Sequence, residues 1–149
     1  MENLLRLKAA GLDDLEVISA CLQDALTRVG DMTFLAEEGR FVVIFSRFMW
    51  ENADVAPGAK GMRVRTGLHF DNVATVSTQG IDQGDREGLL PLLAVVGAPA
   101  GDGVRITLQF AGGGSLRLDA ASVSAQLRDM GLPWPTPSRP DHADADRIG

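Results

Sequence analysis

The chain has little cysteine: Cys21 is the single thiol among 149 residues. One thiol excludes an intramolecular disulfide and fits a reducing compartment, and we expect Cys21 to be a buried structural residue. The chain also lacks a long apolar run. Its start has no signal-peptide character, and the most apolar segment, 89–98, is interrupted by Pro91 and Gly97 and is too short to span a bilayer. These absences predict a cytoplasmic protein with no membrane contact.

An excess of basic residues is missing as well. Lysine and arginine together number 14 against 20 acidic residues, which gives a formal net charge of −6. No basic tail or basic domain stands out in the sequence. Binding to nucleic acid or to an anionic membrane requires several cations on one face. The composition therefore weighs against both kinds of partner.

Histidine, the commonest metal ligand and general base, occurs twice, as His69 and His142. Neither an H-x-x-x-H nor a C-x-x-C pair is present, so we expect no metal and no cofactor. Nucleophilic catalysis needs a serine or cysteine beside a base, and there is no G-x-S-x-G. His69 with Asp71 could form an oriented base, but two residues at this spacing share a face only if the turn has not begun, so His69 is interpreted as a surface residue before a turn. The sequence predicts no catalytic residue and a non-enzymatic protein.

Alternation of apolar and polar residues predicts a mostly antiparallel β structure of class α+β. The strand over 62–70 is the clearest, with Val64, Thr66, Leu68 and Phe70 on the inner face. After it, two registers remain: a two-residue turn at 71–72 faces Thr75 and Ser77 inward, whereas a three-residue turn that includes Val73 faces Ala74, Val76 and Thr78 inward. The second register is preferred because it buries the better residues. Seven strands are expected in all, at 29–36, 40–50, 62–70, 74–79, 89–98, 104–111 and 115–118.

Turns are marked by glycine. Glu37-Glu38-Gly39 predicts a short hairpin loop with Gly39 in the left-handed region, and Gly112-Gly113-Gly114 predicts a hairpin rather than a phosphate-binding loop, because another strand follows and the Lys-Ser/Thr of a P-loop is absent. The strands 40–50 and 89–98 are apolar on both faces, which predicts a cover on each side.

Helices are expected at both ends of this strand series. An N-terminal β-α unit comprises a strand near Leu5 to Ala9 and a helix from Asp13 or Asp14 with Leu15, Ile18, Leu22 and Ala25 on one stripe; it is the expected cover for strand 40–50. A second helix is expected from Asp119, with Val123, Leu127 and Met130 on one face, ended by Gly131 at C′ and by Pro133.

These elements predict one domain over residues 1–134, followed by an extended or disordered proline-rich tail over 135–149. Seven antiparallel strands closed by a C-terminal helix resemble the pleckstrin-homology-like barrel, with the N-terminal β-α unit as an extension; a sandwich is the alternative. Phosphoinositide-binding members of that fold carry basic residues in the first hairpin loop. Glu37 and Glu38 occupy it here, which argues against a lipid headgroup.

Four motifs resemble an uncharacterised proteobacterial family known as domain of unknown function 2948. They are R-F-M-W-E at 47–51, R-T-G-L-H-F-D-N-V at 65–73, F-A-G-G-G at 110–114 and G-L-P-W-P-T-P-S-R-P at 131–140. The resemblance covers nearly the whole chain. It implies an identity without an activity, a cofactor or a site.

The candidate interaction face consists of Arg63, Arg65 and His69 on one side of strand 62–70, with Arg47 and Trp50 on the neighbouring strand. A flat basic and aromatic face suits an acidic peptide or another subunit. Trp134 is expected to pack on the barrel as a lid. We therefore expect a non-enzymatic protein-interaction or scaffold module. The alternative is a small-ligand-binding or enzyme accessory domain that uses a cavity under the C-terminal helix.

Overall fold

The computed structural model describes residues 4–50 and 61–136. Its elements are one α-helix, two short 3-10 helices and ten strands. In chain order they are β1 (Arg6–Ala9), α1 (Asp14–Cys21), β2 (Leu26–Arg28), η1 (Val29–Asp31), β3 (Met32–Leu35), η2 (Ala36–Glu38), β4 (Arg40–Phe48), β5 (Gly61–Phe70), β6 (Val73–Gln79), β7 (Leu89–Ala100), β8 (Gly103–Phe110), β9 (Ser115–Ala120) and β10 (Ala125–Thr136).

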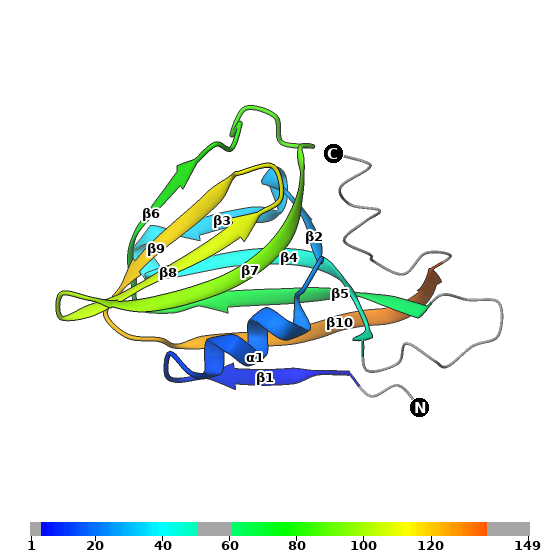
Figure 1. Cartoon of the computed structure of the whole chain (residues 1–149), viewed down its shortest axis with the longest axis horizontal. Coiled ribbons are helices and arrows are strands. Elements are labelled where there is room, and N and C mark those ends of the chain that lie inside the picture. Colours follow the sequence, from blue (N-terminus) through cyan, green and yellow to red (C-terminus); the bar gives the residue numbers. More distant parts are fainter. Residues whose placement is uncertain (1–3, 51–60, 137–149) are drawn as a thin grey trace.

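All ten strands belong to one curved antiparallel sheet (Figure 1). The strand order is β1-β10-β5-β4-β2-β7-β8-β9-β6, and β3 pairs with β4 beside that path. The sheet is open, with β1 at one end and β6 at the other. The sheet therefore does not close into the predicted barrel, whereas the mostly antiparallel β structure with a helix is confirmed, and the likeness to the pleckstrin-homology-like fold stays a prediction. Ten strands replace the expected seven because β2 and β10 were missed and β1, expected as an extension, joins the same sheet.

The predicted C-terminal helix is also wrong. Residues 125–136 form β10, which pairs with β1 on one side and β5 on the other. The helical spacing of Val123, Leu127 and Met130 coincided with a strand alternation in which Val123, Ala125, Leu127 and Asp129 all point inward. Because the inward residue Asp129 is charged, the sequence around it does not show the alternation of apolar and polar residues that predicts a strand. β10 reaches Thr136, so the domain extends past the expected boundary at residue 134, and residues 137–149 of the predicted tail lie outside the described chain.

The N-terminal β-α unit is confirmed, but its helix covers a different strand. Leu15, Ile18 and Leu22 are buried in the core. β2 pairs with β7 as far as Pro91; beyond it, α1 takes the place of a neighbouring strand, and Ser19 Oγ accepts a hydrogen bond from the Val95 N–H at 2.9 Å. Figure 1 shows α1 lying between β1 and β7. The helix thus lies alongside the part of β7 that β2 does not reach.

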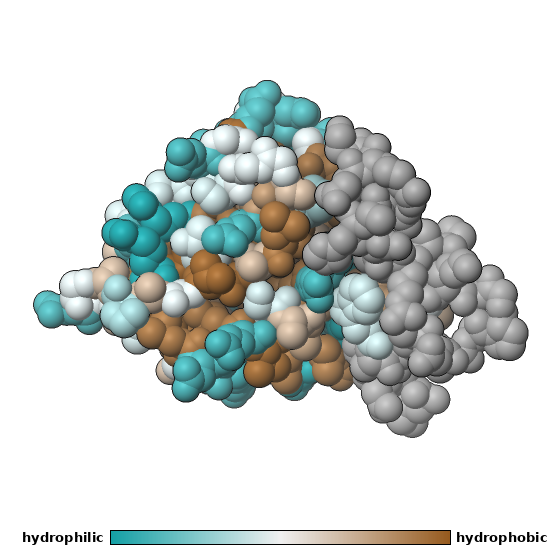
Figure 2. Space-filling view, in the orientation of Figure 1, coloured by the Kyte–Doolittle hydropathy of each residue, from teal (hydrophilic) through white to brown (hydrophobic). Residues whose placement is uncertain are grey.

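Two strands were expected to be buried on both faces, and each has one exposed or half-buried face. On β4, Phe41, Val43, Phe45 and Arg47 are buried, and Val42 and Ile44 on the other face are half-buried. On β7, Leu92 and Val95 are buried. Its other apolar side chains reach solvent, where Figure 2 shows apolar surface around β7 and α1; the most exposed are Leu89, Leu93 and Val96.

The predicted glycine turns are confirmed. Gly39 has φ +61° between η2 and β4, and Gly112 and Gly113, with φ of +88° and +92°, join β8 to β9. The turn after β5 combines the two registers. Its loop is Asp71-Asn72, but a bulge between Val73 and Thr75 shifts the phase, so Val73 is buried and Val76 half-buried while Thr75 is exposed.

Within the described residues, no helix is long and apolar enough to cross a membrane.

Candidate functional site

The outward face of β5 carries the basic residues that the sequence singled out. Val64, Thr66, Leu68 and Phe70 are buried, and the residues between them, among them Arg63, Arg65 and His69, point to the other side of the sheet. Their common face on β5 is therefore as predicted. Successive side chains of a strand point to opposite faces of the sheet, so the residues between the buried ones point away from the core.

Strand pairing adds three cations that the sequence analysis did not include. On β10, Arg128 lies opposite Gly67 of β5, and on β1, Arg6 lies opposite Arg128 and Lys8 opposite Gln126. Residues directly opposite each other in an antiparallel pair share a face of the sheet. Arg6, Lys8 and Arg128 therefore extend the β5 row across two further strands. We call Arg6, Lys8, Arg63, Arg65, His69 and Arg128 the basic face.

The outward positions of the three strands contain no carboxylate within the described chain: they are Arg6, Lys8, Gln126, Arg128, Met130, Arg63, Arg65, Gly67 and His69. Arg6, Lys8, Arg65 and Arg128 are exposed, and none has an ion-pair partner among the described residues. Arg6 and Arg128 face each other directly, which is unfavourable for like charges. Although the net charge of the chain is −6, this face of the sheet carries four exposed cations without an ion-pair partner among the described residues.

Arg63 differs from its neighbours because it is partly buried and bonded. Its Nε donates to Ser46 Oγ and its Nη2 to the Ser46 carbonyl oxygen, both at 3.0 Å. Desolvation lowers the pKa of Arg63, which still leaves the guanidinium charged. Trp134 lies opposite Arg63 across the β5–β10 pair, with 40% of its surface exposed. The indole therefore borders the basic face, and its packing as a lid stays a prediction.

His69 stands at the edge of this face beside Asp71. The His69 Nε2 lies 3.5 Å from Asp71 Oδ2 and has no hydrogen-bond partner in the described chain. Asp71 Oδ1 instead accepts a 2.7 Å hydrogen bond from Arg40 Nε, and this bond raises the pKa of Arg40. His69 and Asp71 do approach each other, but no nucleophilic side chain completes a catalytic arrangement with them among the described contacts.

Arg47 does not belong to the interaction face, and this part of the prediction is wrong. Its side chain is fully buried on the inner face of β4, in phase with Phe41, Val43 and Phe45. It forms a two-pronged ion pair with Asp129 of β10: Nε to Oδ1 at 2.8 Å and Nη2 to Oδ2 at 2.7 Å. The signal in the sequence was that each of these two charged residues occupies an inward position of an apolar alternation, although their pairing across 82 residues was not visible in it.

The Asp129 carboxylate accepts two more hydrogen bonds, from Thr66 Oγ1 and from the Leu5 N–H, both at 2.8 Å. Burial by itself raises the pKa of the Asp129 carboxyl, but the hydrogen bonds from Arg47, Leu5 and Thr66 outweigh it, so the pKa lies below its usual value. This cluster ties β4, β5, β10 and the residue before β1 together in the interior. Its place and its saturation with hydrogen bonds give it a structural role.

Trp50 contacts the end of β4 and the segment after α1. It follows the end of β4, its Nε1 donates to the Gln23 carbonyl oxygen at 3.2 Å, and its ring meets Phe48 edge-on with centroids 4.7 Å apart. These contacts attach the end of β4 to the segment after α1. That Trp50 also joins the arginines of β5 stays a prediction.

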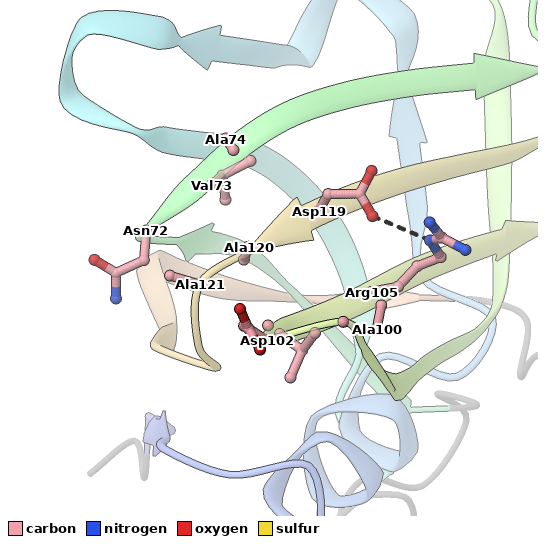
Figure 3. A pocket seen from close by; sticks show the side chains of 12 residues that line it. Asn72, Val73, Ala74, Ala100, Asp102, Arg105, Asp119, Ala120 and Ala121 are labelled. Carbon is pink, nitrogen blue, oxygen red and sulfur yellow. Dashed lines mark hydrogen bonds and ion pairs between the residues drawn. The ribbon is translucent and has the colours of Figure 1, made fainter.

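A shallow, open pocket of about 750 Å³ lies elsewhere, between the start of β6, the β7–β8 hairpin and the end of β9 (Figure 3). Its charged side chains include Asp102, Arg105 and Asp119. Arg105 Nε donates to Asp119 Oδ1 at 3.0 Å, and this hydrogen bond lowers the pKa of Asp119. Because the one arginine that lines the pocket is already paired with Asp119, the pocket offers no unpaired cation to an anionic ligand. No group of three or more potential metal ligands occurs in the described residues.

Comparison with known proteins identifies the family and nothing finer. The model of a family described as a protein of unknown function (DUF2948) matches residues 5–142, so the chain belongs to that family. No curated protein and no solved structure matches the chain.

Proposed function

We propose that this member of the DUF2948 family is a non-enzymatic interaction module that binds an acidic segment of another protein on its basic face. The observation that carries the proposal is the pairing of Arg6 directly opposite Arg128, beside the unpaired cations Lys8 and Arg65. Like charges held opposite each other reduce the stability of the isolated protein. An anionic partner placed over them removes that repulsion and gains charge-assisted hydrogen bonds.

The nature of the anion follows from the shape and surroundings of the face. The outward side of β1, β10 and β5 is a sheet surface bordered by Met130 and Trp134. Arginine and tryptophan are the residues that most often dominate binding energy between proteins. The rest of the chain is acidic, which repels a long polyanion beyond the immediate site. A short acidic peptide segment fits these conditions better than a nucleic acid.

The alternative function is that of a small-ligand-binding or enzyme accessory domain, and the structural feature on which it depended is not formed. It required a cavity under a C-terminal helix, and the residues concerned form β10. The open pocket near Asp119 is at the other end of the strand order and has its arginine engaged. We therefore favour the interaction module.

The proposal is tested with a fluorescent glutamate-rich peptide and its glutamine-rich counterpart, titrated with the protein at low and high salt. We expect binding of the acidic peptide that weakens as salt rises. The double variant R6E/R128E reverses two opposed cations and should weaken binding by about tenfold or more, a change of about 1.4 kcal/mol. The control R86E/R117E makes the same charge change on exposed arginines outside the basic face and should bind nearly as well as wild type.

Three results would contradict the proposal. Equal loss in R6E/R128E and R86E/R117E would indicate a response to net charge alone. Tighter binding of a single-stranded oligonucleotide of matched charge would identify a nucleic-acid interface instead. Failure of the wild type to distinguish the glutamate peptide from the glutamine peptide would leave the basic face as solvated surface.

A further inference from the structure

The last strand of the sheet, β6, has one unpaired edge. β6 pairs with β9 along its length, and it is the terminal strand in the order. On the other edge the Val73 N–H donates to the Gly39 carbonyl oxygen at 2.9 Å, and within the described chain residues 74–79 have no backbone partner on that side. Figure 1 shows β6 at the margin of the molecule, in green at the upper left. The edge is thus open from Ala74 onward.

This edge carries none of the features that prevent strands of different molecules from pairing. The sequence of β6, V-A-T-V-S-T-Q, has no charge and no proline over seven residues. The opposite end of the sheet, β1, has four residues and carries Arg6 and Lys8. Charged residues, proline and short length are the usual protections of an edge strand. β1 is therefore protected, and β6 is suited to pairing.

We propose that β6 pairs antiparallel with β6 of a second copy of the chain, which gives a two-fold symmetric dimer with a continuous sheet. The register follows from the strand itself. Antiparallel overlap of the open residues 74–78 with their own copy places Val76 on the two-fold axis and Thr75 opposite Ser77 of the second copy. The half-buried Val76 side chain then meets its own copy, a β-branched pair of the kind that stabilises sheets.

The charges beside β6 are compatible with this register. On β9, Asp119 lies opposite Thr75 and Arg117 lies opposite Ser77. On the exposed face, four side chains then lie in line across the junction. They are Asp119 and Thr75 of one copy, followed by Ser77 and Arg117 of the other. No like charges meet at the junction. The basic face lies at the other end of the strand order and stays accessible in such a dimer.

The test uses two variants that change the same two positions. T75K/S77K places lysine opposite lysine at the junction, whereas T75K/S77E places lysine opposite glutamate. Within one chain, the lysine introduced at position 75 in either variant faces Asp119, and the glutamate introduced at position 77 faces Arg117. The two variants therefore differ in the sign of one charge, and both substituted side chains are exposed.

The oligomeric state is measured by sedimentation velocity at protein concentrations up to about 1 mM. This range would detect even a weak dimer with a dissociation constant of about 1 mM. We expect a dimer that dissociates on dilution for wild type and for T75K/S77E, and dimerisation weakened at least tenfold for T75K/S77K. A wild type that stays monomeric at 1 mM overturns the proposal, as does a dimer that T75K/S77K leaves unchanged. Loss of the dimer in T75K/S77E overturns the Val76-centred register.

Hydrogen exchange of the wild type keeps the test decisive if T75K/S77K does not fold. The amides of residues 74–79 should exchange more slowly at high than at low protein concentration, because pairing protects the open edge. Equal exchange at the two concentrations contradicts the dimer.

Discussion

Replacing Asp129 with alanine should destabilise the protein more than almost any other single change, because it leaves a buried arginine without its counter-ion. The side chains of Arg47 and Asp129 are both fully buried, and two hydrogen bonds of 2.7 and 2.8 Å join them. Removal of one partner of a buried ion pair typically costs about 3–5 kcal/mol. Typical domains have a stability of about 5–15 kcal/mol, so D129A should lose a large part of the total.

The double variant R47M/D129L separates the cost of an unpaired charge from the contribution of the pair. Because it removes both charges and fills the space with apolar side chains, it should be less destabilised than D129A. The assay is urea unfolding at pH 7 followed by far-UV circular dichroism. A loss below about 1 kcal/mol in D129A would refute the reasoning, and so would a double variant that loses as much as the two single changes added together.

The same carboxylate sets a pH dependence. The folded protein lowers the pKa of Asp129, so its contribution to stability is complete above the unfolded pKa, about 3.9, and is lost as pH falls through the lower folded value. The stability of wild type should therefore decline below about pH 4 more steeply than that of D129N, measured by urea unfolding at a series of pH values.

Three further changes test other parts of the structure by the same unfolding assay. Gly131 has φ +74° with open space around it, so G131A should cost about 1 kcal/mol and G131V more; a silent G131V would contradict the left-handed backbone. F45A should cost about 3–5 kcal/mol because the ring is 1% exposed, and I44A, on the half-buried face, clearly less; equal costs would mean equal burial. R65E should change stability by no more than about 0.5 kcal/mol, whereas R63E removes two hydrogen bonds and should cost more; the reverse order would contradict their placement.

Local patterns in the sequence determined much of the sheet. The alternation in β5 correctly separated buried from outward residues, because a period of two is a property of any extended strand with one buried face. Gly39, Gly112 and Gly113 marked real turns because only glycine adopts positive φ without steric cost. Gly131 was correctly assigned a left-handed conformation for the wrong reason: it lies where the β5–β10 register shifts, not at a helix end.

The tertiary structure decided what alternation alone did not. Asp129 interrupts an otherwise inward apolar row, and a charge in that position is tolerated because Arg47, 82 residues away in the chain, reaches it inside the fold. A buried charge needs a partner, and no local pattern shows where a partner so distant in sequence will lie. The same long-range pairing moved Arg47 from the predicted surface into the core and turned the predicted helix into β10.

The basic face illustrates the same division. The sequence placed Arg63, Arg65 and His69 together because they share one strand, a relation that spacing alone defines. Arg6 and Arg128 are separated by more than a hundred residues and meet because β1 and β10 pair in one particular register. A shift of that register by one residue would turn Arg6 to the other face. Strand spacing therefore determined the row within β5, and the pairing of strands distant in the chain determined the face.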